Sequence, residues 1–207
     1  MIIFVQKNEM VTDFINLKNL LINDRTCRRF DASKSVDETT LLNLVELTRY
    51  CASGRNLQPL KYRIVTDCDE RNLIFPSLKW AGYYTDWDGP DKTERPAAYL
   101  VQCLDTQYGN DCLCDDGLQL QAITLGATSL GLRCCIIKAF NAAEISARLE
   151  IPDSLKPRYV VAIGYPAEEI VVEDMNGLPD DSYIYYRDSM GRHHVPKRKL
   201  SELIIKC

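Results

Sequence analysis

The sequence lacks any long apolar run. No stretch of its 207 residues approaches the roughly 18–20 apolar residues of a membrane span, and the opening Met-Ile-Ile-Phe-Val is too short for a signal sequence and has no basic leader. An excess of positive charge is also missing, because 25 Lys and Arg stand against 29 Asp and Glu. General nucleic-acid and membrane-surface binders need such an electrostatic footprint. We therefore expect a cytoplasmic protein that binds neither nucleic acid nor membrane.

Cysteine is abundant, but no Cys-x-x-Cys pair occurs among the nine cysteines. This absence argues against zinc-knuckle and thioredoxin-type sites. Most of the thiols are expected to be small, buried apolar groups in a reducing compartment. Cys112-x-Cys114 and the pair His193 and His194 are the candidate metal ligands, yet four ligands at the spacing of a structural site are not visible. We expect no metal site.

No Gly-x-Gly-x-x-Gly motif follows an apolar run, so the sequence offers no dedicated Rossmann site for a nicotinamide cofactor. Internal repeats and convincing domain boundaries are absent as well. A chain of this length with 46% hydrophobic and 26% charged residues is most simply one domain with a sizeable core. We expect a single domain over residues 1–207, with an N-terminal extension at residues 1–9.

Apolar spacing predicts helices and strands in alternation. The expected helices cover residues 11–22, the segment after the capping box Ser35–Glu38, residues 116–131 and residues 142–149. The expected strands cover residues 61–67, 98–104, 134–137 and 158–164. The helix over 116–131 is apolar nearly all round and ends at Gly131, which indicates a buried central helix with a glycine stop.

The expected order is helix–helix–strand–helix–strand–helix–strand–helix–strand, with a further helix between the first two strands, and it predicts an α+β layered sandwich. Residues 166–198 are rich in proline, glycine and charge and have little periodicity. We expect this segment to wrap a surface before a short terminal helix at 199–205.

A basic motif, Arg-Thr-Cys-Arg-Arg-Phe at residues 25–30, directly follows the first expected helix. Guanidinium groups match phosphate oxygens better than ammonium groups do. Arg25 and Arg28 are three residues apart and can point the same way, and Thr26 can add a hydroxyl. The hexapeptide taken alone is also typical of a solvated charge run at a helix end.

A small polar turn, Ala-Ser-Gly-Arg-Asn-Leu-Gln-Pro at residues 52–59, connects the second expected helix to the first strand. Ser53 and Asn56 can hydrogen-bond a polar planar ligand, and Gly54 allows close approach of the backbone. Pro59 should bias Gln58 toward an extended conformation. The alternative is an ordinary helix-to-strand loop with an asparagine turn.

At these two segments the chain resembles the nitroreductase-like flavoprotein family, whose members open with an Arg-Ser-x-Arg-x-Phe-like motif and carry a Pro-Ser-Ser-x-Asn-x-Gln-Pro-like turn after the next helix. Here Thr26 stands for the serine, Ala52-Ser53-Gly54 for Pro-Ser-Ser, and Asn56-Leu57-Gln58-Pro59 is intact. Similar segments follow at Gly131–Lys138 and Gly164–Pro166. The resemblance implies a three-layer sandwich with a central mixed β-sheet flanked by helices, and a C-terminal arm over 166–207 that wraps a dimer.

The resemblance also implies that FMN binds at the interface of a homodimer, with the turn of each chain contributing to the flavin of the partner subunit. The segment Pro196–Glu202 is similar to a terminal family segment whose basic residues reach the phosphate, and the spacing leaves open whether Lys197 or Arg198 does so. Reduction of the flavin ring places negative charge near N1 and O2, so one arginine of the motif can serve the ring instead of the phosphate. The implied cofactor-binding residues are Arg25, Thr26, Arg28, Ala52, Ser53, Gly54, Asn56, Gln58, Ile136, Ile137, Lys197 and Arg198.

Two positions depart from the family pattern near the expected flavin edge, because Ile136 replaces a tryptophan and Lys138 a glycine. Residues 76–96 combine both tryptophans with loop-forming residues, which predicts a mobile aromatic flap. Its Tyr83, Tyr84 and Trp87 are expected to stack on an electron acceptor, although such aromatics are also typical of simple packing.

The implied function is an FMN-dependent oxidoreductase that takes hydride from NADH or NADPH and reduces a nitroaromatic, quinone or similar conjugated acceptor by a ping-pong mechanism. The flavin carries the chemistry, so no side chain is expected to act as nucleophile or general base. The alternatives are a flavin-binding protein without turnover, a relative that dehalogenates or desaturates its substrate on the same flavin, and a cysteine-rich metal or redox sensor.

Overall fold

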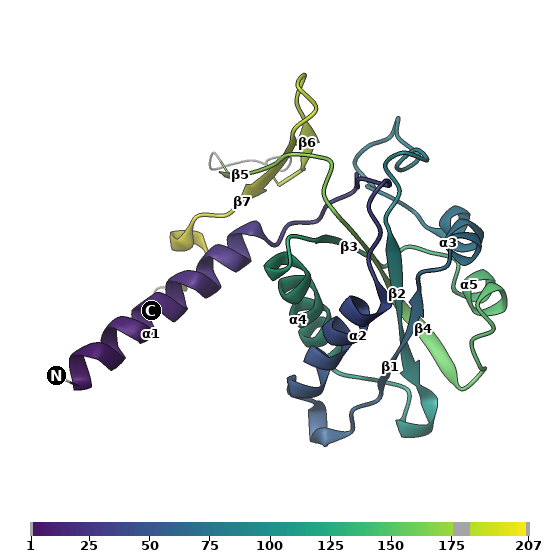
Figure 1. Cartoon of the computed structure of the whole chain (residues 1–207), viewed down its shortest axis with the longest axis horizontal. Coiled ribbons are helices and arrows are strands. Elements are labelled where there is room, and N and C mark those ends of the chain that lie inside the picture. Colours follow the sequence, from purple (N-terminus) through teal and green to yellow (C-terminus); the bar gives the residue numbers. More distant parts are fainter. Residues whose placement is uncertain (1, 176–182, 206–207) are drawn as a thin grey trace.

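The computed structural model describes residues 2–175 and 183–205, and its helices and strands follow the expected order (Figure 1). Cys207 and part of the expected C-terminal arm lie outside the described residues. The elements of the main body are α1 (Ile2–Asn23), α2 (Glu38–Glu46), β1 (Leu60–Val65), α3 (Cys68–Ile74), β2 (Ala98–Asp105), α4 (Asp115–Ser129), β3 (Arg133–Ile137), α5 (Ala142–Arg148) and β4 (Leu155–Gly164).

A four-stranded sheet in the order β1-β2-β4-β3 forms the middle layer (Figure 1). The alternation along β2 feeds two cores, because Tyr99 and Val101 pack on the side of Ile145 in α5, whereas Leu100 packs on the side of Ile123 in α4. The expected α+β three-layer sandwich is therefore confirmed. All pairings within this sheet are antiparallel, so it is not the mixed sheet that the resemblance implied.

The helix ends follow local chemistry. The expected capping box at Ser35 is wrong by two residues, since Asp37 is the N-cap of α2 and its Oδ1 accepts the Thr40 N–H at 2.8 Å. The expected glycine stop is confirmed at the end of α4, where Gly131 has φ +77° in the left-handed region that favours glycine.

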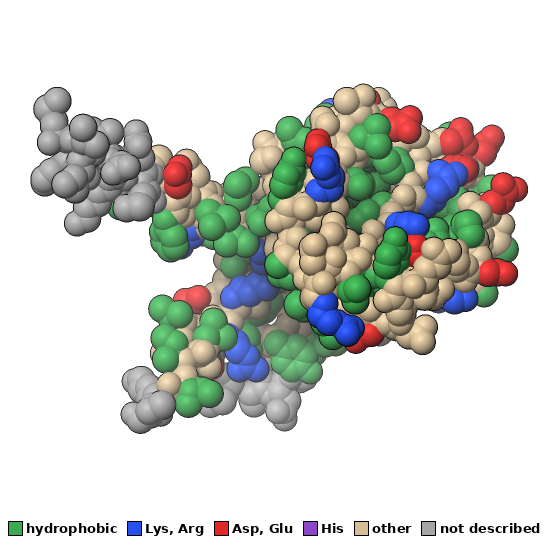
Figure 2. Space-filling model, turned by 90° about the horizontal axis from the view of Figure 1, so that it is seen from below, with side chains coloured by type: hydrophobic (Ala, Val, Ile, Leu, Met, Phe, Trp, Pro, Cys, Tyr) green, Lys and Arg blue, Asp and Glu red, His purple; other side chains and the backbone are tan. Residues whose placement is uncertain are grey.

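The first helix begins at Ile2 and projects from the body, so most of the expected N-terminal extension belongs to α1 (Figure 1). Phe14 in α1 is 67% exposed, and Leu118 and Leu130 at α4 are 43% and 54% exposed, so α4 is not buried all round as expected. Figure 2 shows apolar side chains along the projecting part of α1. No helix in residues 2–175 and 183–205 has the length and apolar character needed to cross a bilayer.

The described part of the C-terminal segment forms a second, smaller sheet, which its low periodicity did not predict; that this arm wraps a dimer stays a prediction. Its strands are β5 (Ile170–Asp174), β6 (Tyr186–Arg187) and β7 (His193–Lys197), in the order β5-β7-β6. The β5 and β7 pair is parallel and the β6 and β7 pair antiparallel. The expected terminal helix is a single 3-10 turn at Leu200–Glu202. This second sheet lies above the end of α1 in Figure 1 and forms one wall of the site described next.

Candidate functional site

A cavity of about 220 Å³ opens where α1 ends, between the basic motif, α4, β3 and β7. Five of the expected cofactor residues line it: Arg25, Thr26, Arg28, Ile136 and Lys197. The other lining residues were not predicted as site residues from the sequence; they are Asp24, Gln121, Thr124, Cys134, Tyr185, His193 and Val195. Residues of the basic motif, Ile136 in β3 and Lys197 at the end of β7 therefore meet at one place.

Short backbone pairings fix the basic motif against the main sheet. Cys27 N–H donates to the Cys134 carbonyl at 2.9 Å, and Phe30 forms an isolated bridge with Pro166. Cys27 and Phe30 are fully buried in the core. Since their side chains point inward, Arg25 and Arg28 are left to face the cavity, whereas Arg29 pairs with Glu94 at 3.2 Å.

The buried carboxylate of Glu168 binds the backbone of the same motif. Glu168 Oε1 accepts the backbone N–H of Arg28 at 2.5 Å and that of Arg29 at 3.2 Å, while Oε2 pairs with Arg187 at 2.8 Å. The Glu168 side chain is 2% exposed. It therefore ties the basic motif to β6, although nothing in the charge-rich sequence around it marks this role.

The Arg28 guanidinium is held by uncharged groups. Its Nη1 donates to His193 Nε2 at 3.1 Å, and its carbon lies 4.5 Å from the centre of the Tyr185 ring. Among the described residues no carboxylate pairs with the guanidinium of Arg25 or Arg28, and the buried Nε of each has no hydrogen-bond partner. Two uncompensated cations with unused donors fit an anion such as a phosphate.

The two C-terminal cations are separated by the structure. Lys197, at the end of β7, lines the cavity, whereas Arg198 is not among the lining residues. Partial burial, followed by the positive charge of Arg25, lowers the pKa of Lys197. A bound anion would relieve this repulsion. Of the two cations only Lys197 lines this cavity, so its contact with a phosphate is the prediction that the structure favours.

The end of α1 is fixed to α4 by polar contacts inside the cavity. Asp24 Oδ2 accepts from Gln121 Nε2 at 2.5 Å and from Thr124 Oγ1 at 2.7 Å. The apolar pattern of residues 116–131 predicted no role for Gln121 and Thr124. They orient the start of the basic motif relative to the central helix.

His193 is buried between Arg28 and Tyr84, and its tautomer follows from those contacts. Because a guanidinium only donates, Nε2 must accept from Arg28, so Nδ1 carries the hydrogen and donates to the Tyr84 hydroxyl. Burial, followed by the positive charge of Arg28, lowers the pKa of His193 to about 4. The imidazole is neutral at pH 7 and adds no charge to the cavity.

This histidine predicts a pH dependence of folding. With a folded pKa of about 4 and an unfolded pKa of 6.5, the unfolded chain binds a proton between these values and the folded chain does not. The contribution of neutral His193 to the free energy of unfolding is therefore fully present above pH 6.5 and is lost as the pH falls toward 4. Measured midpoints of thermal unfolding should rise from pH 4.5 to 6.5, and H193Q should flatten that rise.

The neighbouring His194 supplies the control, because its dependence has the opposite sign. Burial alone would lower its pKa, but hydrogen bonds with Glu173 and Asp188 raise the pKa overall. Its contribution is present below pH 6.5 and is lost as the pH rises through the folded pKa. The variant H194Q should leave the slope from pH 4.5 to 6.5 in place; an equal flattening by both variants would contradict the assignment.

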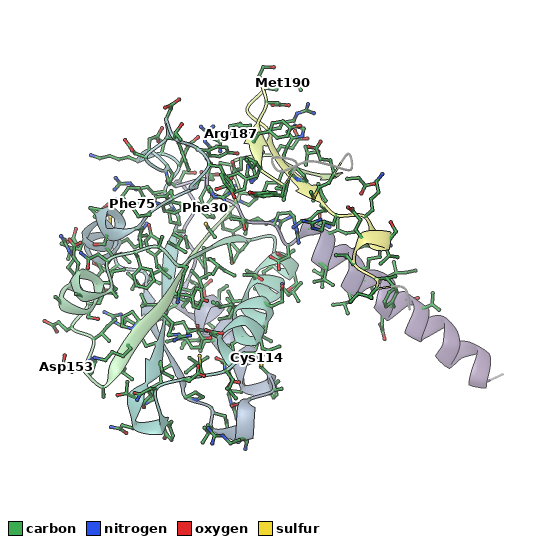
Figure 3. All side chains as sticks on the ribbon, turned by 180° about the vertical axis from the view of Figure 1, so that it is seen from behind. Phe30, Phe75, Cys114, Asp153, Arg187 and Met190 are labelled. Atoms are coloured by element: carbon green, nitrogen blue, oxygen red, sulfur yellow. The ribbon has the colours of Figure 1, made fainter. Side chains whose placement is uncertain are left out.

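The polar turn lies away from the cavity, against the start of α4. Ser53 Oγ donates to Asp115 Oδ2 at 2.6 Å, and Gly54 N–H donates to Asp115 Oδ1 at 2.9 Å. Figure 3 shows Cys114, which precedes Asp115, toward one end of the molecule and Arg187, near the cavity, toward the other. Within one chain the turn does not join the basic motif. The cavity lining therefore includes none of Ala52, Ser53, Gly54, Asn56 and Gln58.

The local conformation of the turn differs from two expectations. Gln58 is not extended before Pro59 but has φ +50°, because its N–H donates to Ser53 Oγ at 2.9 Å. Gly54 does permit a close approach, but of Leu113, whose Cδ1 would lie 2.4 Å from an added Cβ. The glycine therefore serves packing within the chain.

Residues 136–138 divide between the cavity and the rest of the protein. Ile136 is 40% exposed and lines the cavity, whereas the Ile137 side chain lies in the core and cannot contact a ligand there. Lys138 Nζ donates to the Arg158 carbonyl at 3.2 Å and lies 4.3 Å from the Tyr159 ring centre. Of the two positions that depart from the family pattern, the Lys138 side chain points away from the cavity, and the Ile136 side chain forms an apolar part of its lining.

The flap aromatics Tyr83 and Tyr84 pack against Tyr185, which itself lines the cavity. Ring centres are 5.0 Å apart for Tyr83 and Tyr185 and 6.1 Å apart for Tyr84 and Trp87. The Arg187 guanidinium lies over both Tyr84 and Trp87, at 4.9 and 5.3 Å. The expected stacking of these aromatics on an acceptor stays a prediction.

A glycine in the flap makes its packing testable. Gly89 has φ +120°, and an added Cβ would lie 2.5 Å from Cδ1 of Trp80. We expect G89A to lower the free energy of unfolding by about 1–3 kcal/mol, from backbone strain and the clash together. Chemical denaturation should show this loss, while G82A in the same flap, with open space around it, should change stability by less than about 0.5 kcal/mol. Equal losses of unfolding free energy in G89A and G82A would contradict the close packing of Gly89 against Trp80.

The described cysteines form no disulfide bridge, and the thiol at the cavity wall is not an activated nucleophile. The described cysteines are all free. Burial raises the pKa of the Cys134 thiol, at the cavity wall, well above its ordinary value. No group of three or more His, Cys, Asp and Glu side chains suited to a metal occurs among the described residues. Cys134 is therefore an apolar wall residue at neutral pH.

Comparison with known proteins adds the family. The nitroreductase family model matches residues 23–103 and 113–165. A nitroreductase family protein from Clostridium difficile 630 has 18% identity and a TM-score of 0.60, with 90% of this chain and 95% of that one covered. An FMN-dependent nitroreductase from Clostridium difficile R20291 has 21% identity and a TM-score of 0.60, with 72% and 87% covered. The NADPH:FMN oxidoreductase from Vibrio harveyi has 20% identity and a TM-score of 0.58, with 74% of this chain and 70% of that one covered. These likenesses establish the fold, and the match to more than half of the chain shows that the protein belongs to the nitroreductase family.

Proposed function

We propose that the protein is an FMN-dependent oxidoreductase that takes hydride from NADH or NADPH and reduces a conjugated acceptor, such as a nitroaromatic or a quinone, by a ping-pong mechanism. The observation that carries the proposal is the set of three cations at one cavity, Arg25, Arg28 and Lys197, for which the described residues provide no carboxylate partner. Family membership supports it, as do the names of two similar structures, an FMN-dependent nitroreductase and an NADPH:FMN oxidoreductase.

The described residues fit the phosphate end of FMN. Arg25 and Arg28 each have an unused buried Nε, and Lys197 faces the same cavity. Three cations match a phosphate that carries a charge of about −1.5 to −2. Glu168 and His193 hold the motif and its guanidinium without placing a free negative charge on the phosphate.

When bound, FMN supplies the hydride chemistry, and the protein supplies placement and electrostatics. Neutral His193 keeps the Arg28 charge undiminished, and Ile136 and Cys134 provide apolar wall beside the cations. Arg25 and Arg28 are the cations that would stabilise negative charge on a reduced ring if one of them faces it.

We further propose that the working form is a homodimer in the cytoplasm. The polar turn over 52–58 faces away from the cavity of its own chain, and α1 and α4 carry exposed apolar side chains that a second copy could cover. Each turn would then complete the site of the other chain. The free cysteines support a reducing compartment.

Anaerobic reduction of the purified protein tests the activity. After reconstitution with FMN, the visible bands of the oxidised flavin should bleach on addition of NADH or NADPH and return when a quinone or nitroaromatic is added. Bound flavin that does not bleach would favour a flavin-binding protein without turnover. A protein that takes up no flavin would overturn the proposal.

A further inference from the structure

Asp115, the first residue of α4, connects the turn to the body through a buried carboxylate. It is 1% exposed, and its two oxygens accept from Ser53 Oγ at 2.6 Å and Gly54 N–H at 2.9 Å. Ser53 Oγ in turn accepts the N–H of Gln58 at 2.9 Å. One carboxylate thus holds Ser53 and Gly54 directly and, through the Ser53 hydroxyl, Gln58 near the other end of the turn.

The turn that Asp115 holds is strained. Arg55, Asn56 and Gln58 have φ values of +54°, +56° and +50°, in the left-handed region that non-glycine residues rarely adopt. Such conformations persist where the surroundings over-determine them, and they concentrate at binding sites. Without the Asp115 contacts, relaxation of residues 55–58 would lower the strain.

The strained head of the turn is directed to solvent. Asn56 and Gln58 are exposed, and Gln58 Nε2 donates to Asn56 Oδ1 at 3.2 Å, which aligns the two amides. The cavity beside the turn measures only about 60 Å³ and is lined partly by Leu113 and Asp111. An aligned pair of amides with no receiving site in its own chain is suited to a ligand held by another chain.

From this geometry we propose that Asp115 is a positioning residue for the flavin site of a second copy of the chain. It acts through Ser53 and Gly54 and touches no ligand itself. The inference rests on the proposed function, in which the turn of one chain completes the cavity of the other. A preformed turn saves the ordering cost that a loose loop would add on binding.

The first test compares FMN affinity in three variants. D115A removes both acceptors and should weaken FMN binding at least tenfold, whereas D115N keeps an acceptor oxygen and should recover much of the loss. D153A, at an exposed carboxylate remote from the turn, should bind as the unchanged protein does. Unchanged affinity in D115A would overturn the inference, while a wild-type protein that binds no FMN would overturn the proposed function itself.

Mixed dimers decide whether Asp115 acts across the interface, even if D115A weakens the chain. Differently tagged R28A and D115A chains are refolded together, and the doubly tagged species is isolated. If the turn serves the partner, one site carries both changes and the other neither, so about half of the wild-type FMN content should return at wild-type affinity. If Asp115 served its own cavity, each site would carry one change and no wild-type site would appear, which would contradict the inference.

Discussion

The variant R28A should bind FMN about 10- to 150-fold more weakly than the wild-type protein. Hydrogen bonds to charged groups contribute about 1.5–3 kcal/mol, and each 1.4 kcal/mol corresponds to a factor of ten in affinity. The Arg28 guanidinium has no carboxylate partner among the described residues and rests on His193 and Tyr185, so a bound phosphate would be its main charged contact. Quenching of flavin fluorescence measures the affinity directly.

A neighbouring cation provides the matched control. Arg198 lies near the end of β7 beside Lys197 but is not among the residues that line the cavity. R198A should therefore bind FMN within about twofold of wild type, since only a long-range charge is removed. K197A should resemble R28A more than R198A. Equal losses in R28A and R198A would show that net charge, and not the cradle, retains the flavin.

The second large effect is on stability. E168A should lower the free energy of unfolding by about 3–5 kcal/mol, the usual cost of removing one partner of a buried ion pair. Its loss would leave the Arg187 guanidinium, 17% exposed, without its carboxylate and two backbone N–H groups of the basic motif without acceptors. Urea denaturation followed by tryptophan fluorescence should report the loss, because Arg187 also packs on Trp87.

An exposed ion pair calibrates this result. Glu46 pairs with Arg49 at 3.3 Å, but both side chains are more than half exposed. Surface pairs of this kind contribute little, so E46A should change the unfolding free energy by less than about 1 kcal/mol. A loss in E168A no larger than that in E46A would mean that Glu168 does not hold the motif.

The core elements could be predicted because their signals are local. The apolar spacing over residues 11–22 predicted the second half of α1, and the burial of Cys27 and Phe30 leaves Arg25 and Arg28 at the cavity. Glu168 could not be predicted, since it lies 140 residues from Arg28 in a charge-rich segment. His193 was considered only as a metal ligand, because its contact with Arg28 exists only once β7 is placed.

Hydropathy patterns also do not distinguish a side chain buried in the core from an apolar side chain exposed at the surface. Leu118 and Leu130 read as part of a buried helix, yet both are exposed in the single chain. An apolar side chain buried inside a fold and one reserved for a neighbouring copy have the same hydropathy. In the same way, Pro59 favours an extended residue before it, but the Ser53 hydroxyl holds Gln58 at positive φ. Tertiary contacts overrode the local preference.

Comparison of FMN with riboflavin tests the central claim most directly, because the two differ only by the phosphate that Arg25, Arg28 and Lys197 are proposed to bind. Two or three charge-assisted contacts should make FMN bind at least about 100-fold more tightly than riboflavin to the wild-type protein. Equal affinity for the two flavins would contradict the assignment of the cavity as a phosphate cradle.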